Sequence, residues 1–171
     1  LWSALEISSG KPVGKVMDSW VKQTGFPMIS VDRTQDSNSI NLSQTRFLYE
    51  HIEAKPDDKE KTSWYVPIKI SSNLEDNLET LLMESSDLKI QLEANEDSNA
   101  SWIKLNPNQT GFFRTKYSES DLENLRNAIV AGELTPRDRL GVQGDYYALV
   151  RAGYTPVENF LNLASGYSTE S

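Results

Sequence analysis

The hydrophobic residues change their spacing twice along the chain, from helical to alternating and back to helical. Residues 1–5 begin an apolar face that breaks at Gly10. Residues 13–21 then carry apolar side chains at positions i, i+3, i+4, i+7 and i+8, which is the pattern of an amphipathic helix. Pro12 suits the start of that helix and Gly25 suits its end. Two helices are therefore predicted at the N-terminal end.

The middle of the chain alternates between apolar and polar side chains, as half-buried strands do. Pro67 lies within one alternating run and predicts an edge strand or a bulge there. A change of parity between residues 40 and 52 indicates a bulge or a strand break. About seven short strands with polar turns between them predict an antiparallel β-sandwich. The predicted strands lie within residues 28–33, 40–52, 64–70, 78–83, 88–92 and 102–117.

The last of these segments, residues 102–117, has the most distinctive sequence in the chain. Residues 102–117 hold two aromatic-rich runs around a turn of Asn, Pro and Gly at residues 106–111. Such a turn between two strand-like runs predicts a β-hairpin that closes the sheet. Its aromatic side chains are expected in the core and in cross-strand pairs.

The helical spacing returns near the end of the chain. Ser120 and Glu123 have the spacing of a capping box at the start of a helix. Thr135 and Thr155 each precede a proline, and an acidic residue follows three positions after each threonine. Both patterns predict helices with a threonine N-cap and proline at the first position. Two such starts in succession predict the beginning of an α-helical array.

Charge and composition exclude several classes of function. The 171 residues carry a net charge of −8 with a pI of about 4.7, and such an acidic chain repels nucleic-acid phosphates. The sequence has no run of 18 apolar residues, so no membrane-spanning helix is predicted. The absence of cysteine rules out disulfides and thiolate chemistry within the chain and fits a reducing, cytoplasmic compartment. We therefore expect no nucleic-acid partner and no membrane association.

Two patterns could hold a metal ion, but both lack required ligands. His51 and Glu53 stand two residues apart at a predicted strand end, without a third ligand nearby. Asp32 begins an alternation of oxygen-bearing side chains that resembles a calcium loop. That loop requires Gly at its sixth position and Glu at its twelfth, where Ser37 and Ser43 stand instead. No catalytic, cofactor-binding or metal-binding residue is therefore assigned to the chain.

Arg137, Asp138 and Arg139 form a charged cluster in the first turn of a predicted helix. Asp138 suits the positive end of the helix dipole, whereas the two arginines do not. The cluster predicts acidic partners elsewhere in the fold, in buried or interdomain salt bridges. Contact with a substrate is the alternative interpretation.

Several motifs occur in an order that is typical of one enzyme family. They lie at residues 9–13, 64–68, 102–117 and 138–141, where the sequence reads SGKPV, WYVPI, WIKLNPNQTGFFRTKY and DRLG. This order resembles the zinc metallo-aminopeptidases (gluzincins) of the puromycin-sensitive and aminopeptidase N type. The resemblance runs through nearly the whole chain. Gly144 departs from the family pattern, where a larger residue is expected.

The resemblance implies a parent enzyme that removes N-terminal residues from peptides by means of zinc-activated water. Such enzymes bind zinc through two His and a Glu, starting from a His-Glu-x-x-His helix. A chain whose one histidine is His51 cannot contain that site. The resemblance therefore implies a non-catalytic fragment that binds no zinc itself and that shapes and hinges the substrate chamber of a cytoplasmic enzyme.

The same resemblance divides the chain into three parts. Residues 1–25 resemble the last helices of the catalytic domain, residues 26–118 a β-sandwich, and residues 119–171 the first helices of a large helical domain. The expected fold class is therefore mainly β with flanking α. The expected partners are peptide substrates, reached through the parent enzyme, and the missing catalytic and helical domains. A stand-alone β-sandwich module that binds other proteins is the alternative.

Overall fold

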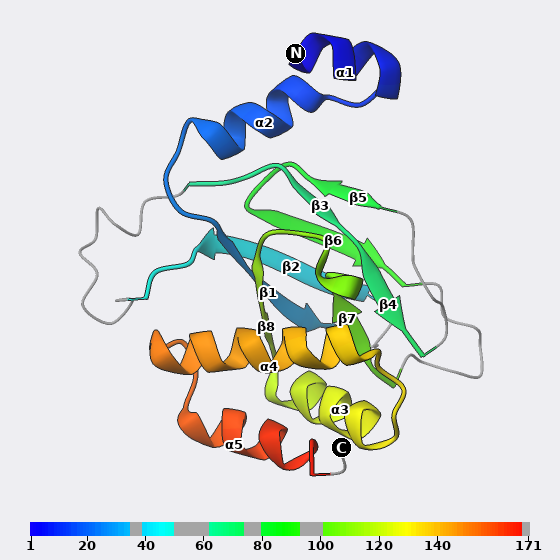
Figure 1. Ribbon diagram of the computed structural model, residues 1–171, viewed down its shortest axis with the longest axis vertical. Coiled ribbons are helices and arrows are strands. Elements are labelled where there is room, and N and C mark those ends of the chain that lie inside the picture. Colours follow the sequence, from blue (N-terminus) through cyan, green and yellow to red (C-terminus); the bar gives the residue numbers. More distant parts are fainter. Residues whose placement is uncertain (35–38, 50–61, 74–79, 93–100, 169–171) are drawn as a thin grey trace.

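The computed structural model describes residues 1–34, 39–49, 62–73, 80–92 and 101–168. Figure 1 shows the N-terminal helices at one end, the C-terminal helices at the other, and β-strands between them. The prediction of a β-rich region with flanking helices is confirmed. None of the helices in the described ranges has the length and hydropathy needed to cross a membrane.

The N-terminal helices are α1 (Trp2–Ser9) and α2 (Val13–Val21). Gly10 ends α1 in the left-handed region, with φ of 65°, which glycine adopts without strain. Neither helix contains a buried residue. The side chains of Ser19 and Trp20 attach α2 to the strands, because Ser19 Oγ accepts the N–H of Tyr65 and Trp20 Nε1 donates to its carbonyl, both at 3.0 Å.

The largest sheet has four strands in the order β6-β2-β1-β8. Strands β1 (Pro27–Arg33), β2 (Ser39–Arg46) and β6 (Asp87–Gln91) pair antiparallel. Strand β8 (Arg114–Tyr117) pairs with β1 in the parallel direction, with Val31 opposite Tyr117. The sheet is therefore mixed at one edge, where the sequence predicted antiparallel strands only.

Two smaller antiparallel sheets lie beside the first. Strand β3 (Val66–Ile68) pairs with β5 (Leu81–Met83), and β4 (Ile70–Ser72) pairs with β7 (Ile103–Leu105). The predicted strand 64–70 thus divides at Lys69 and contributes to both sheets. Pro67 lies in a two-stranded sheet, so it occupies the edge position that the sequence predicted.

The hairpin prediction for residues 102–117 is wrong. Strand β7 pairs with β4 and β8 pairs with β1, so the two ends of the segment enter different sheets. The connection contains a 3₁₀ turn, η2 (Pro107–Gln109), and three residues with positive φ, namely Asn106, Asn108 and Gln109. These left-handed residues turn the chain out of the path that a two-strand hairpin would follow.

The C-terminal helices are α3 (Glu119–Val130), α4 (Pro136–Arg151) and α5 (Val157–Ser165). Thr135 caps α4 as predicted, because its hydroxyl accepts the N–H of Asp138 at 3.2 Å. The cap of α3 is Ser118 rather than Ser120, since Ser118 has the extended backbone and accepts the N–H of Asp121. The cap of α5 is Pro156, and Thr155 accepts the Asn159 side-chain amide instead.

One continuous hydrophobic core joins the strands to these helices. It contains Trp64 and Ile29 from the β-rich region together with Leu125, Tyr146 and Leu149 from α3 and α4. Helices α3 and α4 lie against β8 and the turn before it, as Figure 1 shows. The C-terminal helices are thus packed into the same core as the strands, whereas α1 and α2 contribute no buried residue and α2 touches the core through the partly buried Trp20.

Candidate functional site

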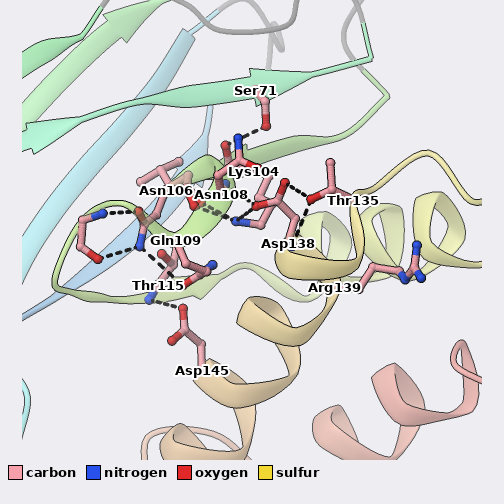
Figure 2. Close-up of polar contacts among 12 residues, drawn as sticks. Ser71, Lys104, Asn106, Asn108, Gln109, Thr115, Thr135, Asp138, Arg139 and Asp145 are labelled. Carbon is pink, nitrogen blue, oxygen red and sulfur yellow. Dashed lines mark hydrogen bonds and ion pairs between the residues drawn. The ribbon is translucent and has the colours of Figure 1, made fainter.

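The densest set of polar contacts lies where the 102–117 segment meets helix α4, and Figure 2 shows it. Its central residue is Lys104, whose side chain is 1% exposed. The Nζ atom donates to the carbonyls of Leu105 at 2.9 Å and Asn106 at 3.0 Å, and it lies 3.0 Å from Asp138 Oδ1. An ammonium group has three donors, so these three acceptors satisfy Lys104 completely.

The partner carboxylate of Asp138 is equally enclosed. Asp138 Oδ1 also accepts the backbone N–H of Asn108 at 2.7 Å, and Oδ2 accepts the Thr135 hydroxyl at 2.7 Å. One carboxylate therefore joins a strand, a turn and a helix cap. We call Lys104, Asp138, Asn108 and Thr135 the ionic junction.

The turn that reaches this junction is held by one asparagine. Asn106 Nδ2 donates to the carbonyl of Gly111 at 3.0 Å, and Asn106 Oδ1 accepts the Gly111 N–H at 2.6 Å. This pair of bonds lets the side-chain amide stand in for a backbone partner and fixes the left-handed turn. Gly111 is required here, because an added Cβ would lie 2.6 Å from the Phe113 ring.

A second acidic residue of α4 extends the contact toward β8. Asp145 Oδ1 lies 3.0 Å from Arg114 Nη1, and Oδ2 accepts the N–H of Thr115 at 3.0 Å. Burial raises the pKa of Asp145 to about 6, against the opposing effects of Arg114, Thr115 and Lys104. Burial also lowers the pKa of Lys104, and the charge of Asp138 opposes this shift.

Two tyrosines join the same strands and helix through uncharged hydrogen bonds. Tyr146 Oη accepts the N–H of Tyr117 at 3.1 Å and donates to its carbonyl at 3.2 Å. Tyr117 Oη in turn accepts the N–H of Leu105 at 2.9 Å. Burial raises the pKa of both hydroxyls above the usual value for tyrosine, so both stay protonated. Strands β7 and β8 and helix α4 are therefore tied together through main-chain atoms.

The charged cluster predicted at the start of α4 is only partly as expected. A buried salt bridge is present, but Asp138 makes it with Lys104. The side chain of Arg139 donates to the Leu134 carbonyl at 2.8 Å, and Arg137 is exposed. The sequence did not indicate that Lys104 is buried. Side chains alternate along a strand, so Lys104 is expected on the face opposite Ile103 and Leu105. All three are buried since β7 is covered on both sides.

The described residues contain no group of three or more His, Cys, Asp or Glu side chains arranged to hold a metal ion. His51 and Glu53 lie outside the described residues, as do two members of the calcium-loop pattern that begins at Asp32. The chemistry of the junction is ion pairing and hydrogen bonding between structural elements.

Comparison with known proteins finds similarity to one group of enzymes. The model of the ERAP1-like C-terminal domain matches residues 102–171, from the strand that carries Lys104 onward. The chain is 36% identical to Aminopeptidase M1 of Arabidopsis thaliana over 181 residues, which is 99% of this chain and 20% of that protein. It is 37% identical to Aminopeptidase M1-A of Oryza sativa subsp. japonica, with 100% and 19% covered.

A third relative, Puromycin-sensitive aminopeptidase of Caenorhabditis elegans, is 30% identical, with 99% of this chain and 18% of that protein covered. Along nearly its whole length, the chain is similar to a segment of M1 aminopeptidases. It spans about a fifth of the length of the M1 aminopeptidases that it matches. The family resemblance inferred from the sequence motifs is therefore confirmed, and the ionic junction lies within the part matched by the domain model.

Proposed function

We propose that this chain is a non-catalytic segment of a zinc-dependent aminopeptidase that removes N-terminal residues from peptides. The observation that carries the proposal is the similarity to named aminopeptidases along 99% of the chain, at 36% identity. In this proposal the zinc ion and the catalytic residues belong to the rest of the parent enzyme. This segment supplies scaffold, with residues 26–118 as a β-sandwich and residues 119–171 as the start of a helical domain.

The proposed role of the scaffold is to shape the substrate chamber and to act as the hinge of the helical part. The ionic junction supports this role, because it fixes the position of α4 relative to the strands through buried bonds from three elements. A buried ion pair also specifies geometry, because misplacement leaves two buried charges unpaired. Peptide substrates and the remaining domains are its proposed partners. The cysteine-free sequence supports a cytoplasmic location for the parent.

The proposal is tested first on the isolated chain. We expect the purified chain to bind no stoichiometric zinc and to leave aminoacyl-anilide substrates uncleaved, because it lacks the ligand set for the metal. Elemental analysis and an absorbance assay measure both, with the Caenorhabditis elegans puromycin-sensitive aminopeptidase as the active control. Zinc-dependent cleavage by the chain alone would overturn the proposal.

A chimera tests the scaffold role directly. We expect the Arabidopsis thaliana aminopeptidase to keep zinc-dependent cleavage when this chain replaces its matching segment, because the two segments are 36% identical. The matched control carries the Oryza sativa segment in the same place. If the chimera folds and holds zinc but loses all cleavage while the control remains active, the proposed interchangeability is wrong.

The alternative function is a stand-alone module that binds other proteins. It predicts that residues 1–25, 26–118 and 119–171, the three zones of the chain, all resist proteolysis. The structure favours the fragment, because α1 and α2 bury no residue and Leu1 and Ile7 are 89% and 87% exposed. We expect limited proteolysis to remove residues 1–25 first and to leave the strands together with α3 and α4, which share their core. Resistance of all three zones would favour the stand-alone module.

A further inference from the structure

An apolar groove of about 310 Å³ lies between helix α2 and the turn that joins β7 to β8. Met17 and Trp20 form part of the α2 wall, and Phe112 and Phe113 form part of the wall opposite. Protein pockets that bind whole ligands begin at about 300 Å³. A groove of this size accommodates one bulky apolar side chain with part of its neighbouring backbone.

One residue on the rim of the groove is exposed at an energetic cost. The Phe112 side chain is 69% exposed, although its ring lies 6.2 Å from that of Trp20 and 5.1 Å from that of Phe26. The turn that presents it is fixed by the paired hydrogen bonds between Asn106 and Gly111. A large apolar ring held rigidly in solvent beside a groove is typical of a binding surface.

The charge of the groove indicates the chemistry of its occupant. Among the described residues that line it, Lys69 is the one charged residue, and it is exposed. Lys69 takes part in none of the salt bridges between described residues. A single cation at the edge of an apolar surface, on a chain with a net charge of −8, complements a carboxylate placed next to an apolar group.

We propose that this groove seats a bulky apolar side chain, next to an acidic residue, from the polypeptide that forms the remainder of the aminopeptidase. The inference rests on the proposed function. The M1 relatives are about five times longer than this chain, so most of their polypeptide lies outside it. Helix α2, which forms one wall, buries none of its own residues within the described structure, and its Val21 is 62% exposed. Both observations favour an occupant from the same protein.

The test titrates the 171-residue chain with the blocked dipeptide acetyl-Glu-Phe-amide and follows the Trp20 indole N–H by NMR. Acetyl-Gln-Phe-amide and acetyl-Glu-Ala-amide are the matched probes, which lack the charge and the ring respectively. We expect acetyl-Glu-Phe-amide to bind two- to five-fold more tightly than acetyl-Gln-Phe-amide, as for a partly exposed ion pair. Acetyl-Glu-Ala-amide should not shift the indole signal.

Two substitutions locate the binding. Lys69→Gln should abolish the difference between the Glu and Gln probes, whereas Lys89→Gln, on strand β6 outside the groove, should preserve it. Phe112→Ser should weaken both probes without unfolding the chain, because the side chain is largely exposed. Absence of any indole shift, or equal binding of the three probes, overturns the inference.

Sedimentation velocity tests whether a second copy of this chain, rather than another part of the enzyme, occupies the groove. Concentration-dependent dimerisation that Phe112→Ser abolishes would assign the groove to a second copy of this chain and would also overturn the inference. Failure of the dipeptide titration leaves the aminopeptidase proposal standing, because that proposal is tested by zinc content and cleavage. Zinc-dependent cleavage by the isolated chain would instead overturn the aminopeptidase proposal whatever the titration shows.

Discussion

The buried pair of Lys104 and Asp138 gives the sharpest prediction, because its cost can be estimated from geometry. The Lys104 Nζ atom and Asp138 Oδ1 are 3.0 Å apart, and the two side chains are 1% and 6% exposed. At an effective dielectric constant of about 20, two unit charges at that distance attract with about 5–6 kcal/mol. The loss of one partner leaves the other charge buried, which costs about 3–5 kcal/mol of folding free energy.

We therefore expect Lys104→Met to lower the free energy of unfolding by about 3–5 kcal/mol, since Asp138 and two backbone carbonyls then lose their cation. The double variant Lys104→Met/Asp138→Asn should cost about 2–3 kcal/mol less than the sum of the two single variants. These variants and the original chain form a double-mutant cycle. Urea unfolding, followed by tryptophan fluorescence, measures the free energy of unfolding of all four proteins.

The chain contains a matched control for this cycle. Lys22 and Asp18 form a pair only 2.6 Å apart, but their side chains are 70% and 52% exposed. The cycle built from Lys22→Met and Asp18→Asn should give a coupling below about 0.5 kcal/mol, because water screens exposed charges. The reasoning would be refuted if the two cycles gave the same coupling, since burial would then not determine the strength of the pair.

Three further predictions follow from other parts of the molecule. Gly144→Ala should raise the free energy of unfolding by about 0.5–1 kcal/mol, because a Cβ at Gly144 meets no atom within 4 Å and glycine weakens a helix. The matched change Gly141→Ala should raise the free energy of unfolding by less than Gly144→Ala does, because its Cβ would displace the Gln109 side chain. Denaturation of both variants tests the pair, and equal effects would contradict it. Asp145 should stabilise the fold fully below about pH 4 and lose that contribution as the pH rises through about 6, since its pKa is raised from 3.8 to about 6. Asp145→Asn should flatten this part of the curve of stability against pH, and an unchanged slope would show that another group causes it. Trypsin or subtilisin should release residues 1–25 before it cuts α3 or α4, as mass spectrometry of early digests would show, and early cleavage within α4 would count against the shared core.

The sequence predicted those features that local chemistry controls. The start of α4 is specified by Thr135 and Pro136, which supply a cap and a preset φ within two adjacent residues. The cap of α3 was misplaced by two residues, because Ser118 and Ser120 offer the same hydroxyl and only the backbone distinguishes them. Element boundaries of this kind depend on conformations that composition does not reveal.

Features that depend on distant residues could not be predicted in the same way. Strands β7 and β8 have the composition of a hairpin, yet each finds a partner elsewhere because the left-handed turn at Asn106 directs them apart. Lys104 has the position of an exposed strand residue, and its burial depends on Asp138, a residue more than thirty positions later. That this chain contains no catalytic site stays a prediction, and it depends on neither local conformation nor distant contacts, because it rests on counting one residue type.

The parallel pairing of β1 with β8 also bears on how the chain is made. Strand β1 leaves the ribosome about 80 residues before β8 does, so one edge of β1 has no partner during the synthesis of the whole intervening stretch. Closing a loop of that length costs conformational entropy before the pairing repays it. Nascent chains that stop short of residue 117 should therefore expose β1 to chaperones, and completion of the fold should coincide with the emergence of α3.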